Sequence, residues 1–357
     1  MTQHLKLGII GCGEATQLLH LPALAVLPDL FEVRALCDIS RTVVDGVAAS
    51  LPGVFATTEP DELLACEDLD AVLVANPSVL HGDTALAAIQ AGKHVLIEKP
   101  IAFTEAEADR LAAAQQAAGV TVQIGYMRRQ APAFRQAKAE IAALSDISLA
   151  RVHAVIGPNT AFTKDTARVI RGTDLPQSAL DALAARQAEL RAEVPGCEDP
   201  AKAAIYDLLL NLSSHDLSAM RELIGVPKGV LYAKRGANPL VLSAALDYGD
   251  FVCQFETAID RIARFDSHIE VYAPEKVVRV QYDTPYIRNL KTTLHLTEAE
   301  GEFGVRTSVS HSTPRDSFTL QWEQFHHNVT TGTTPTADIA DARTDFALFR
   351  QIMAALA

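Results

Sequence analysis

Two short motifs, each following an apolar β-type run, are the parts of this sequence best suited to chemistry. Gly11-Cys12-Gly13 follows the run at residues 7–10, and Glu98-Lys99-Pro100 follows the run at residues 95–97. Open parallel sheets bind ligands beyond the carboxyl ends of their strands. A proline fixes the backbone after Lys99, which directs the ammonium into a cleft rather than into bulk water. The pattern indicates a nucleotide at one strand end and a reacting group at another.

The glycine turn has the composition of a dinucleotide-binding loop. Gly11 and Gly13 allow a tight turn and a close approach of backbone N–H groups to a pyrophosphate at a helix N-terminus. Thr16 stands where a third glycine is usual, and a small residue can serve there because that position provides close helix–strand packing. The expected cofactor contacts in this turn are Gly11, Gly13, Glu14, Ala15 and Thr16.

The choice between NAD and NADP depends on the end of the second predicted strand. Asp38 lies at the distance expected for the acid that binds the ribose hydroxyls, and its carboxylate would repel a 2′-phosphate. NAD is therefore favoured. Arg41 keeps NADP open as a cofactor, because an arginine three residues on could reach a phosphate. A helix N-cap is the alternative role for an acid here, and Ser40 suits that role better.

Polar residues also follow the fourth predicted strand. Asn76-Pro77 begins a loop of the kind that lines the nicotinamide-ribose side of a cofactor. His81 lies one turn into the next helix, where a functional role and simple packing are both open. His20, inside the first predicted helix, is interpreted as a packing residue.

A predicted helix in the second half supplies a candidate base. Asn211 and His215 are four residues apart and share one face, with Asp207 a turn further back and leucines nearby to bury that stripe. A histidine held by polar groups suits general base catalysis, since its proton affinity lies near working pH. A buried structural histidine is the commoner explanation of this pattern alone, but Lys99 favours the catalytic one. Asp216 points about 100° away and serves another purpose.

The first 125 residues must position the nucleotide. Apolar runs alternate there with amphipathic stretches of about 10–15 residues, which is typical of βαβ units with right-handed crossovers and a parallel sheet. The expected strands are residues 5–10, 32–37, 54–56, 71–75, 94–97 and 121–124, and the expected helices are residues 17–27, 41–51, 78–91 and 105–118.

After Gly125 the pattern changes. Consecutive strands dominate from residue 228 onward, which favours an antiparallel sheet with one face covered. The expected strands are residues 148–156, 230–235, 240–247, 251–258, 268–272, 277–282, 292–296 and 303–308, and the expected helices are residues 131–144, 178–191, 203–223, 318–331 and 338–355. The sequence predicts an α/β protein with a doubly wound Rossmann domain at residues 1–125 and an α+β domain with a large, mainly antiparallel open sheet at residues 126–357.

Composition argues against several classes of partner. The chain has 357 residues and a formal net charge of −13, which disfavours nucleic acids and anionic membranes. No run reaches the about 20 apolar residues that span a bilayer, and the first residues lead directly into a strand pattern rather than a signal segment. Five scattered cysteines lack metal-ligand spacing, so we expect reduced thiols, no metal and a cytoplasmic location.

The chain resembles the glucose-fructose oxidoreductase / inositol dehydrogenase / rhizopine catabolism (Gfo/Idh/MocA) family. The matching elements are Gly11-Cys12-Gly13, Asp38, Asn76-Pro77 with His81, the His215 helix, and the block Ala91-Gly92-Lys93-His94-Val95 that runs into Glu98-Lys99-Pro100 and is the most specific. The resemblance implies a homodimer or homotetramer built through the second-domain sheet.

The resemblance also assigns roles to individual residues. It implies that Lys99 sits beside the nicotinamide and the reacting carbinol, and that His215 is the histidine of the family's helix motif. Asn211 stands where the family has an acid, so either Asp207 supplies that charge or Lys99 carries more of the proton transfer. Arg128 lies in a segment similar to the family's crossover between domains, where it would support the active-site floor or form a surface ion pair. The implied cofactor contacts beyond the glycine turn are Asp38, Arg41, Asn76, Pro77, His81, Glu98, Lys99, Pro100 and Arg128.

These residues together predict an NAD(P)-dependent oxidoreductase that transfers a hydride between nicotinamide and a secondary alcohol of a sugar, polyol or cyclitol. His215 takes the hydroxyl proton, Lys99 stabilises the developing alkoxide, and Asn211 orients His215 or holds a neighbouring hydroxyl. The alternatives are an NAD-dependent glycosidase that uses transient redox and a dinucleotide-binding regulator without catalysis. Candidate substrate contacts are residues 157–160, Lys164, Arg168, Arg171 and residues 283–288.

Overall fold

The computed structural model describes residues 3–288, 290–311, 313 and 315–356. The chain forms two compact units, each assembled from three stretches of sequence. Unit 1 comprises Met1–Gly125, Ala167–Val194 and Phe318–Phe346, and unit 2 comprises Tyr126–Thr166, Pro195–Ser317 and Ala347–Ala357. Two segments that are remote in sequence therefore pack with the first 125 residues.

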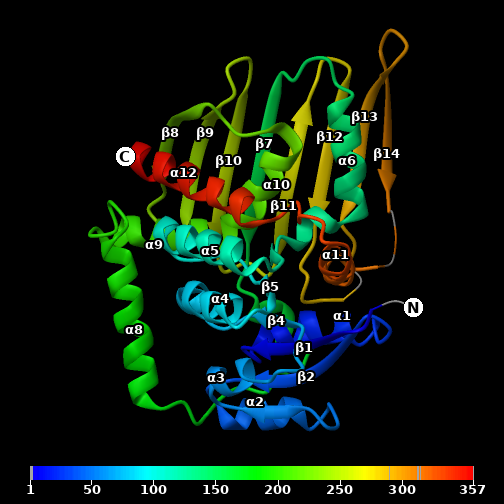
Figure 1. Ribbon diagram of the computed structural model, residues 1–357. Helices are drawn as coiled ribbons and strands as arrows, with labels where there is room; N and C mark the ends of the chain where they lie inside the picture. The colour runs from blue at the N-terminus through cyan, green and yellow to red at the C-terminus, as the bar shows by residue number, and fades with distance from the viewer. Residues whose placement is uncertain (1–2, 289, 312, 314, 357) are drawn as a thin grey trace. The chain divides into compact units, whose positions relative to one another are not determined.

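Unit 1 is built around a six-stranded parallel sheet (Figure 1). Its strands are β1 (Leu5–Ile10), β2 (Phe31–Cys37), β3 (Phe55–Thr57), β4 (Ala71–Val74), β5 (His94–Ile97) and β6 (Val122–Ile124). They lie in the order β3-β2-β1-β4-β5-β6, and every neighbouring pair is parallel. All four residues of β4 are completely buried, as expected of a central strand covered on both faces. The strand order reverses between β1 and β4, which is where open α/β sheets bind ligands.

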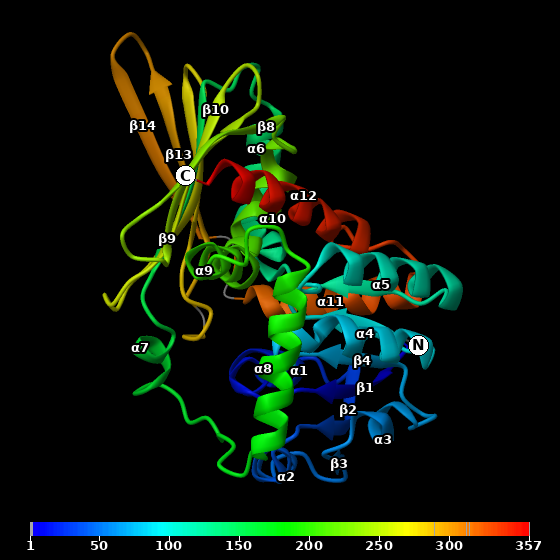
Figure 2. The same ribbon diagram turned by 90° about the vertical axis from the view of Figure 1, so that its left-hand side faces the viewer.

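Helices surround the parallel sheet of unit 1. They are η1 (Thr16–His20, a π-helical turn), α1 (Leu21–Leu24), α2 (Arg41–Ala48), α3 (Pro60–Leu64), η2 (Ser78–Leu80), α4 (His81–Gln90), α5 (Glu105–Ala118), α8 (Gln177–Ala192), α11 (Ser317–Thr331) and the first half of α12 (Ile339–Ala355). Ser40 caps α2 by accepting a hydrogen bond from the amide of Val43 at 3.1 Å, as predicted. The segment before α8 runs past α2 in both ribbon views (Figures 1 and 2).

Unit 2 is built around an eight-stranded mixed sheet. Its strands are β7 (Leu149–Ile156), β8 (Gly229–Arg235), β9 (Val241–Asp247), β10 (Val252–Ile259), β11 (Phe265–Tyr272), β12 (Lys276–Tyr282), β13 (Thr293–Glu300) and β14 (Gly304–Ser310). They lie in the order β14-β13-β12-β11-β7-β10-β9-β8, and only the β7–β10 pair of these is parallel.

Helices pack on one face of this mixed sheet. The helical segments of the unit are η3 (Met127–Gln130), α6 (Pro132–Ala142), α7 (Thr160–Thr163), α9 (Pro200–Leu208), η4 (Leu209–Ser213, a π-helical turn), α10 (Ser214–Ile224) and the second half of α12. Helix α6 packs against β12 and β13, and α10 packs against β7 (Figure 2). Along β7, Ala150, Val152 and Ala154 are buried while Arg151 and His153 on the other face are half-buried. This alternation is what an antiparallel sheet with one covered face requires.

The predicted fold class is confirmed, and the structure differs from the expected elements at several places. The helix expected at residues 17–27 is divided into η1 and the short α1, and α7 was not expected. Helix α3 was not expected, because its five residues are too few to establish a helical period. The helix expected at residues 203–223 is interrupted by η4, whose i→i+5 hydrogen bonds insert an extra residue into one turn. That insertion changes which side chains share a face.

Candidate functional site

The glycine turn after β1 has the geometry of a phosphate-binding loop. Gly11 has a φ of +97°, and a Cβ there would lie 2.4 Å from the carbonyl carbon of Ala75, so only glycine fits. A Cβ at Gly13 would meet no atom within 4 Å, so the space beside it is open to a ligand. Thr16 is buried, and its hydroxyl donates to the carbonyl oxygen of Gly11 at 2.6 Å. Thr16 therefore stabilises the turn in addition to its expected packing role.

Asp38 connects this turn to the start of α2. Its Oδ2 accepts a hydrogen bond from the amide of Cys12 at 2.8 Å, and its Oδ1 accepts one from the amide of Ser40 at 2.9 Å. Each carboxylate oxygen has two lone pairs, so the half-buried group can still accept from ribose hydroxyls. Arg41 lies on the exposed side of α2 and forms an ion pair with Asp45 at 3.5 Å.

His81 joins the ends of β4 and β5. Its Nε2 lies 2.9 Å from the carbonyl oxygen of Asn76, and its Nδ1 lies 2.6 Å from that of Pro100. Burial lowers the pKa of this histidine, whose exposed fraction is 2%, and a neutral ring donates to only one of the two carbonyls. The amide nitrogen of Asn76 donates to Thr84, whereas its buried Oδ1 has no hydrogen-bond partner among the described residues. That oxygen is available to a ligand.

Glu98 is held next to Lys99 by a histidine from the first helix. Its Oε1 accepts a hydrogen bond from Nε2 of His20 at 2.9 Å, and its Oε2 accepts one from the amide of Lys99 at 3.2 Å. Burial favours a higher pKa for Glu98, but the hydrogen bond and charge of His20, together with Lys99, outweigh it and hold the pKa low. A Cβ at Gly125 would lie 2.9 Å from Oε1 of Glu98, so the glycine makes room for this carboxylate. The Lys99–Pro100 peptide bond is cis.

His20 does more than the packing that the sequence predicts. It is fully buried and packs edge-on against the rings of Phe318 and Trp322, as a packing residue would. It also forms the hydrogen bond with Glu98. The two residues are 78 positions apart, and a lone histidine in a helix carries no signal for such a partner.

The residues at the ends of β1, β2, β4 and β5 fit a dinucleotide. Within unit 1 they combine open space at Gly13, a carboxylate at Asp38 and an unsatisfied buried oxygen on Asn76. These are the elements that bind pyrophosphate and ribose hydroxyls at the switch point of a doubly wound sheet.

The helix that carries His215 differs from its expected form. His215 is half-buried at the start of α10, whereas Asn211 is exposed within η4 and its amide donates to the carbonyl oxygen of Asp207 at 2.9 Å. The expectation that one buried stripe contains both residues is therefore wrong. The catalytic roles of His215, Asn211 and Lys99 stay predictions.

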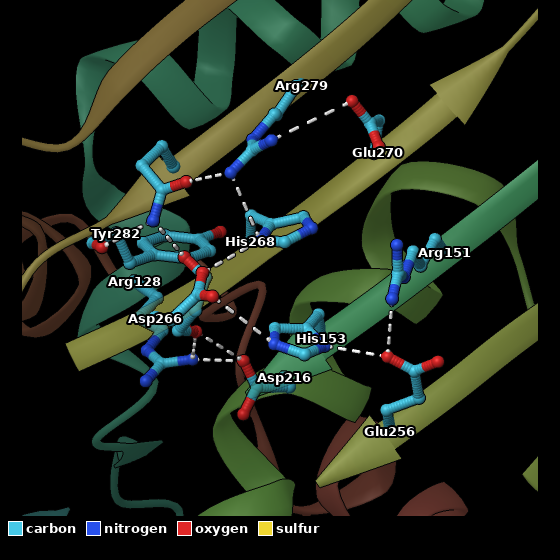
Figure 3. Close-up of polar contacts among 12 residues, drawn as sticks. Arg128, Arg151, His153, Asp216, Glu256, Asp266, His268, Glu270, Arg279 and Tyr282 are labelled. Atoms are coloured by element: carbon cyan, nitrogen blue, oxygen red, sulfur yellow. Dashed lines mark hydrogen bonds and ion pairs between the residues drawn. The ribbon is translucent and has the colours of Figure 1, made fainter. Parts of the chain in front are cut away.

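Arg128 forms a buried ion pair with Asp216, the neighbour of His215 (Figure 3). The exposed fraction of Arg128 is 4%, so its ion pair is buried. The alternative of a surface ion pair, which the sequence left open, is wrong. Its Nη1 also donates to the hydroxyl of Ser267 at 3.0 Å, and its guanidinium lies 4.8 Å from the ring centroid of Tyr282. These contacts all lie in unit 2. The expected contact between Arg128 and the cofactor stays a prediction.

Arg171, a candidate substrate contact in the sequence, contacts the glycine turn. Its Nη2 lies 2.6 Å from Oε2 of Glu14. The neighbouring Ile170 exchanges two hydrogen bonds with the side chain of Gln17, at 2.8 and 2.9 Å. The start of the Ala167–Val194 segment therefore borders the predicted nucleotide site within unit 1.

Two features are absent from the part of the chain that the structure describes. No three His, Cys, Asp or Glu side chains are grouped so that they could hold a metal ion. No helix is both long and apolar enough to cross a membrane.

The fold and this site define a dinucleotide-binding Rossmann domain followed by a second, sheet-rich unit. Residues 5–126 match a family model described as "Oxidoreductase family, NAD-binding Rossmann fold", that of the Gfo/Idh/MocA proteins. The first third of the chain is therefore similar to the NAD-binding domain of this family.

Curated relatives match the same part of the chain. An uncharacterized oxidoreductase, YrbE, of Bacillus subtilis is 32% identical over 138 residues, which are 39% of this chain and 40% of the relative. Inositol 2-dehydrogenase of Salmonella typhimurium is 36% identical over 140 residues, which are 38% of this chain and 40% of the relative. The chain thus matches about two fifths of the length of these relatives.

Solved structures match the whole fold. KijD10, a 3-ketoreductase from Actinomadura kijaniata in complex with TDP-benzene and NADP, has a TM-score of 0.75 and 19% identity, with 99% of this chain and 98% of that chain covered. UDP-N-acetylglucosamine 3-dehydrogenase GnnA from Acidithiobacillus ferrooxidans has a TM-score of 0.73 and 21% identity, with the same coverage. At these identities the likeness shows the fold.

Proposed function

We propose that this chain is an NAD(P)-dependent dehydrogenase that acts on a secondary alcohol of a sugar, polyol or cyclitol. The observation that carries the proposal is the position of Lys99 directly after β5, in the same unit and at the same sheet edge as the glycine turn. The NAD-binding family model and the inositol 2-dehydrogenase relatives support the class of reaction and of substrate.

Each proposed step assigns one task to one side chain. Bound NAD(P) supplies the hydride chemistry at its nicotinamide ring. His215 takes the proton from the substrate hydroxyl, and Lys99 donates a hydrogen bond to the oxygen on which charge develops. Glu98 positions Lys99, since its Oε2 accepts the lysine's own backbone amide. Asn211 binds a neighbouring hydroxyl or orients His215. The mechanism requires Lys99 and His215 to reach the same substrate.

The test is a panel of sugars and inositols with NAD⁺ or NADP⁺, followed by the absorbance of the reduced nicotinamide. We expect turnover of at least one polyol, and loss of that turnover in both Lys99→Met and His215→Asn. Dinucleotide binding without turnover of any panel member would contradict the proposal and favour a regulator. Release of an aglycone from glycosides without net NADH would instead identify the transient-redox glycosidase.

Assembly and location complete the proposal. We infer a homodimer or homotetramer built through the mixed sheet of unit 2, and a cytoplasmic location. Size-exclusion chromatography with light scattering tests the assembly, and a monomer at micromolar concentration would contradict it.

A further inference from the structure

The carboxylate of Asp174 caps the first turn of α2, although the two elements are far apart in sequence. Its Oδ1 accepts the hydroxyl of Ser40, and its Oδ2 accepts the backbone amide of Thr42 at 3.0 Å. These two hydrogen bonds lower the pKa of Asp174. The carboxylate is therefore charged at neutral pH and lies where the helix dipole favours an anion.

The segment that carries Asp174 is fastened to the nucleotide-binding elements along its length. Arg171 pairs with Glu14 of the glycine turn, and Ile170 bonds to Gln17. Gly172 lies so close to Ser40 that a Cβ would be 2.8 Å from the serine hydroxyl oxygen. We call residues 170–174 the strap. All of its contacts named here are with other parts of unit 1.

Asp174 lies at the part of a Rossmann domain that distinguishes NAD from NADP, the end of the second strand. The acid at this strand end binds the 2′-hydroxyl of the adenosine ribose in NAD, and a nearby arginine accommodates the 2′-phosphate in NADP. Here Asp38 accepts the amide of Ser40, while Asp174 accepts the hydroxyl of the same serine. A 2′-phosphate beside Ser40 would meet two carboxylates. It would also lose the donors on Ser40 and Thr42 that could have bound it.

We propose that Asp174 occupies the anion position at the start of α2 that a 2′-phosphate needs, and thereby makes this chain select NAD(H) over NADP(H). The inference rests on the proposed function, because it assumes that a nicotinamide dinucleotide binds at the glycine turn. Asp174 would thus determine cofactor specificity from outside the strand–turn–helix motif that binds the dinucleotide. Removing the carboxylate frees the Ser40 hydroxyl and the Thr42 amide, and Arg41 lies between them in sequence.

The test is fluorescence titration of the full-length protein with NADH and with NADPH. Wild type should bind NADH at least about tenfold more tightly than NADPH, since juxtaposed like charges disfavour the wrong ligand. Asp174→Ala and Asp174→Asn should each tighten NADPH binding by about tenfold or more and change NADH binding by less than about threefold. Asp181→Ala is the matched control, since it removes an exposed carboxylate whose side chain bonds to Gln177 in α8. It should leave the ratio of the two affinities unchanged.

The outcomes separate this inference from the proposed function. Equal affinity of wild type for NADH and NADPH would overturn the role of Asp174, as would an unchanged ratio in both Asp174 variants. In either case NADH binding itself would leave the proposed function standing. Failure of every protein to bind either dinucleotide, with native circular dichroism, would overturn the proposed function and this inference with it.

Discussion

Nε2 of His20 donates to Oε1 of Glu98 at 2.9 Å inside unit 1, next to the lysine that we propose as catalytic. The ring of His20 is fully buried against Trp322, which holds the donor in place. Glu98 in turn accepts the amide of Lys99. The backbone of Lys99 is thus positioned by the side chain of Glu98, which follows β5, and Glu98 is in turn held by His20 of η1.

Lys99 can be tested separately for catalysis and for binding. Lys99→Ala should lower kcat by about 10²–10³, the usual cost of removing a donor to a developing oxyanion. NADH should bind this variant with unchanged affinity by fluorescence titration, because the glycine turn is intact. Normal oxidation of the substrate by Lys99→Ala would exclude the proposed role.

The two glycines of the turn should respond differently to the same substitution. Gly11→Ala should destabilise the protein by about 1–3 kcal/mol or more, because φ is +97° and the methyl group would collide with the backbone of Ala75. Gly13→Ala should change the free energy of unfolding by less than about 1 kcal/mol but weaken NADH binding, since its methyl group enters only the open space beside the turn. Urea unfolding and NADH titration measure the two effects. Equal loss of stability in both variants would contradict this assignment.

The pair of Glu98 and His20 should make stability depend on pH in the acid range. The pKa of Glu98 is lower in the folded protein than in the unfolded chain, so between the two values the unfolded chain binds more protons. Its stabilising contribution is therefore complete above the unfolded value of about 4.3 and is lost as pH falls through the folded value. Urea unfolding at a series of pH values should show a smaller decrease on acidification for Glu98→Gln than for wild type. A steeper decrease in the variant would refute the assigned direction.

Breaking the buried pair of Arg128 and Asp216 should be costly. Arg128→Met leaves an unpaired buried carboxylate and should lower the free energy of unfolding by about 3–5 kcal/mol. Adding Asp216→Asn should recover part of this loss, because the unpaired charge is removed. As a control, Arg306→Met breaks a solvent-screened pair with Glu298 and should lower the free energy of unfolding far less. Similar losses for the two single variants would show that burial of the pair contributes little.

Local sequence was enough to predict most elements and the nucleotide turn. Strand β1 and helix α5 have the predicted bounds, because apolar periodicity and capping residues are encoded within each segment. Ser40 as an N-cap and Gly11 as a tight turn follow from the same local rules. The fold class followed from the order of those elements.

Tertiary structure decided which polar side chains pair with one another. Asp174 lies 134 residues from Ser40, and His20 lies 78 residues from Glu98, so no periodicity or motif connects either pair. The π-helical turn at Leu209–Ser213 is also not anticipated by α-helical spacing. Local patterns determine how each segment folds, because its hydrogen bonds close within a few residues. Only the packing of distant segments determines which charged side chains lie next to the ligand-binding edge of the sheet.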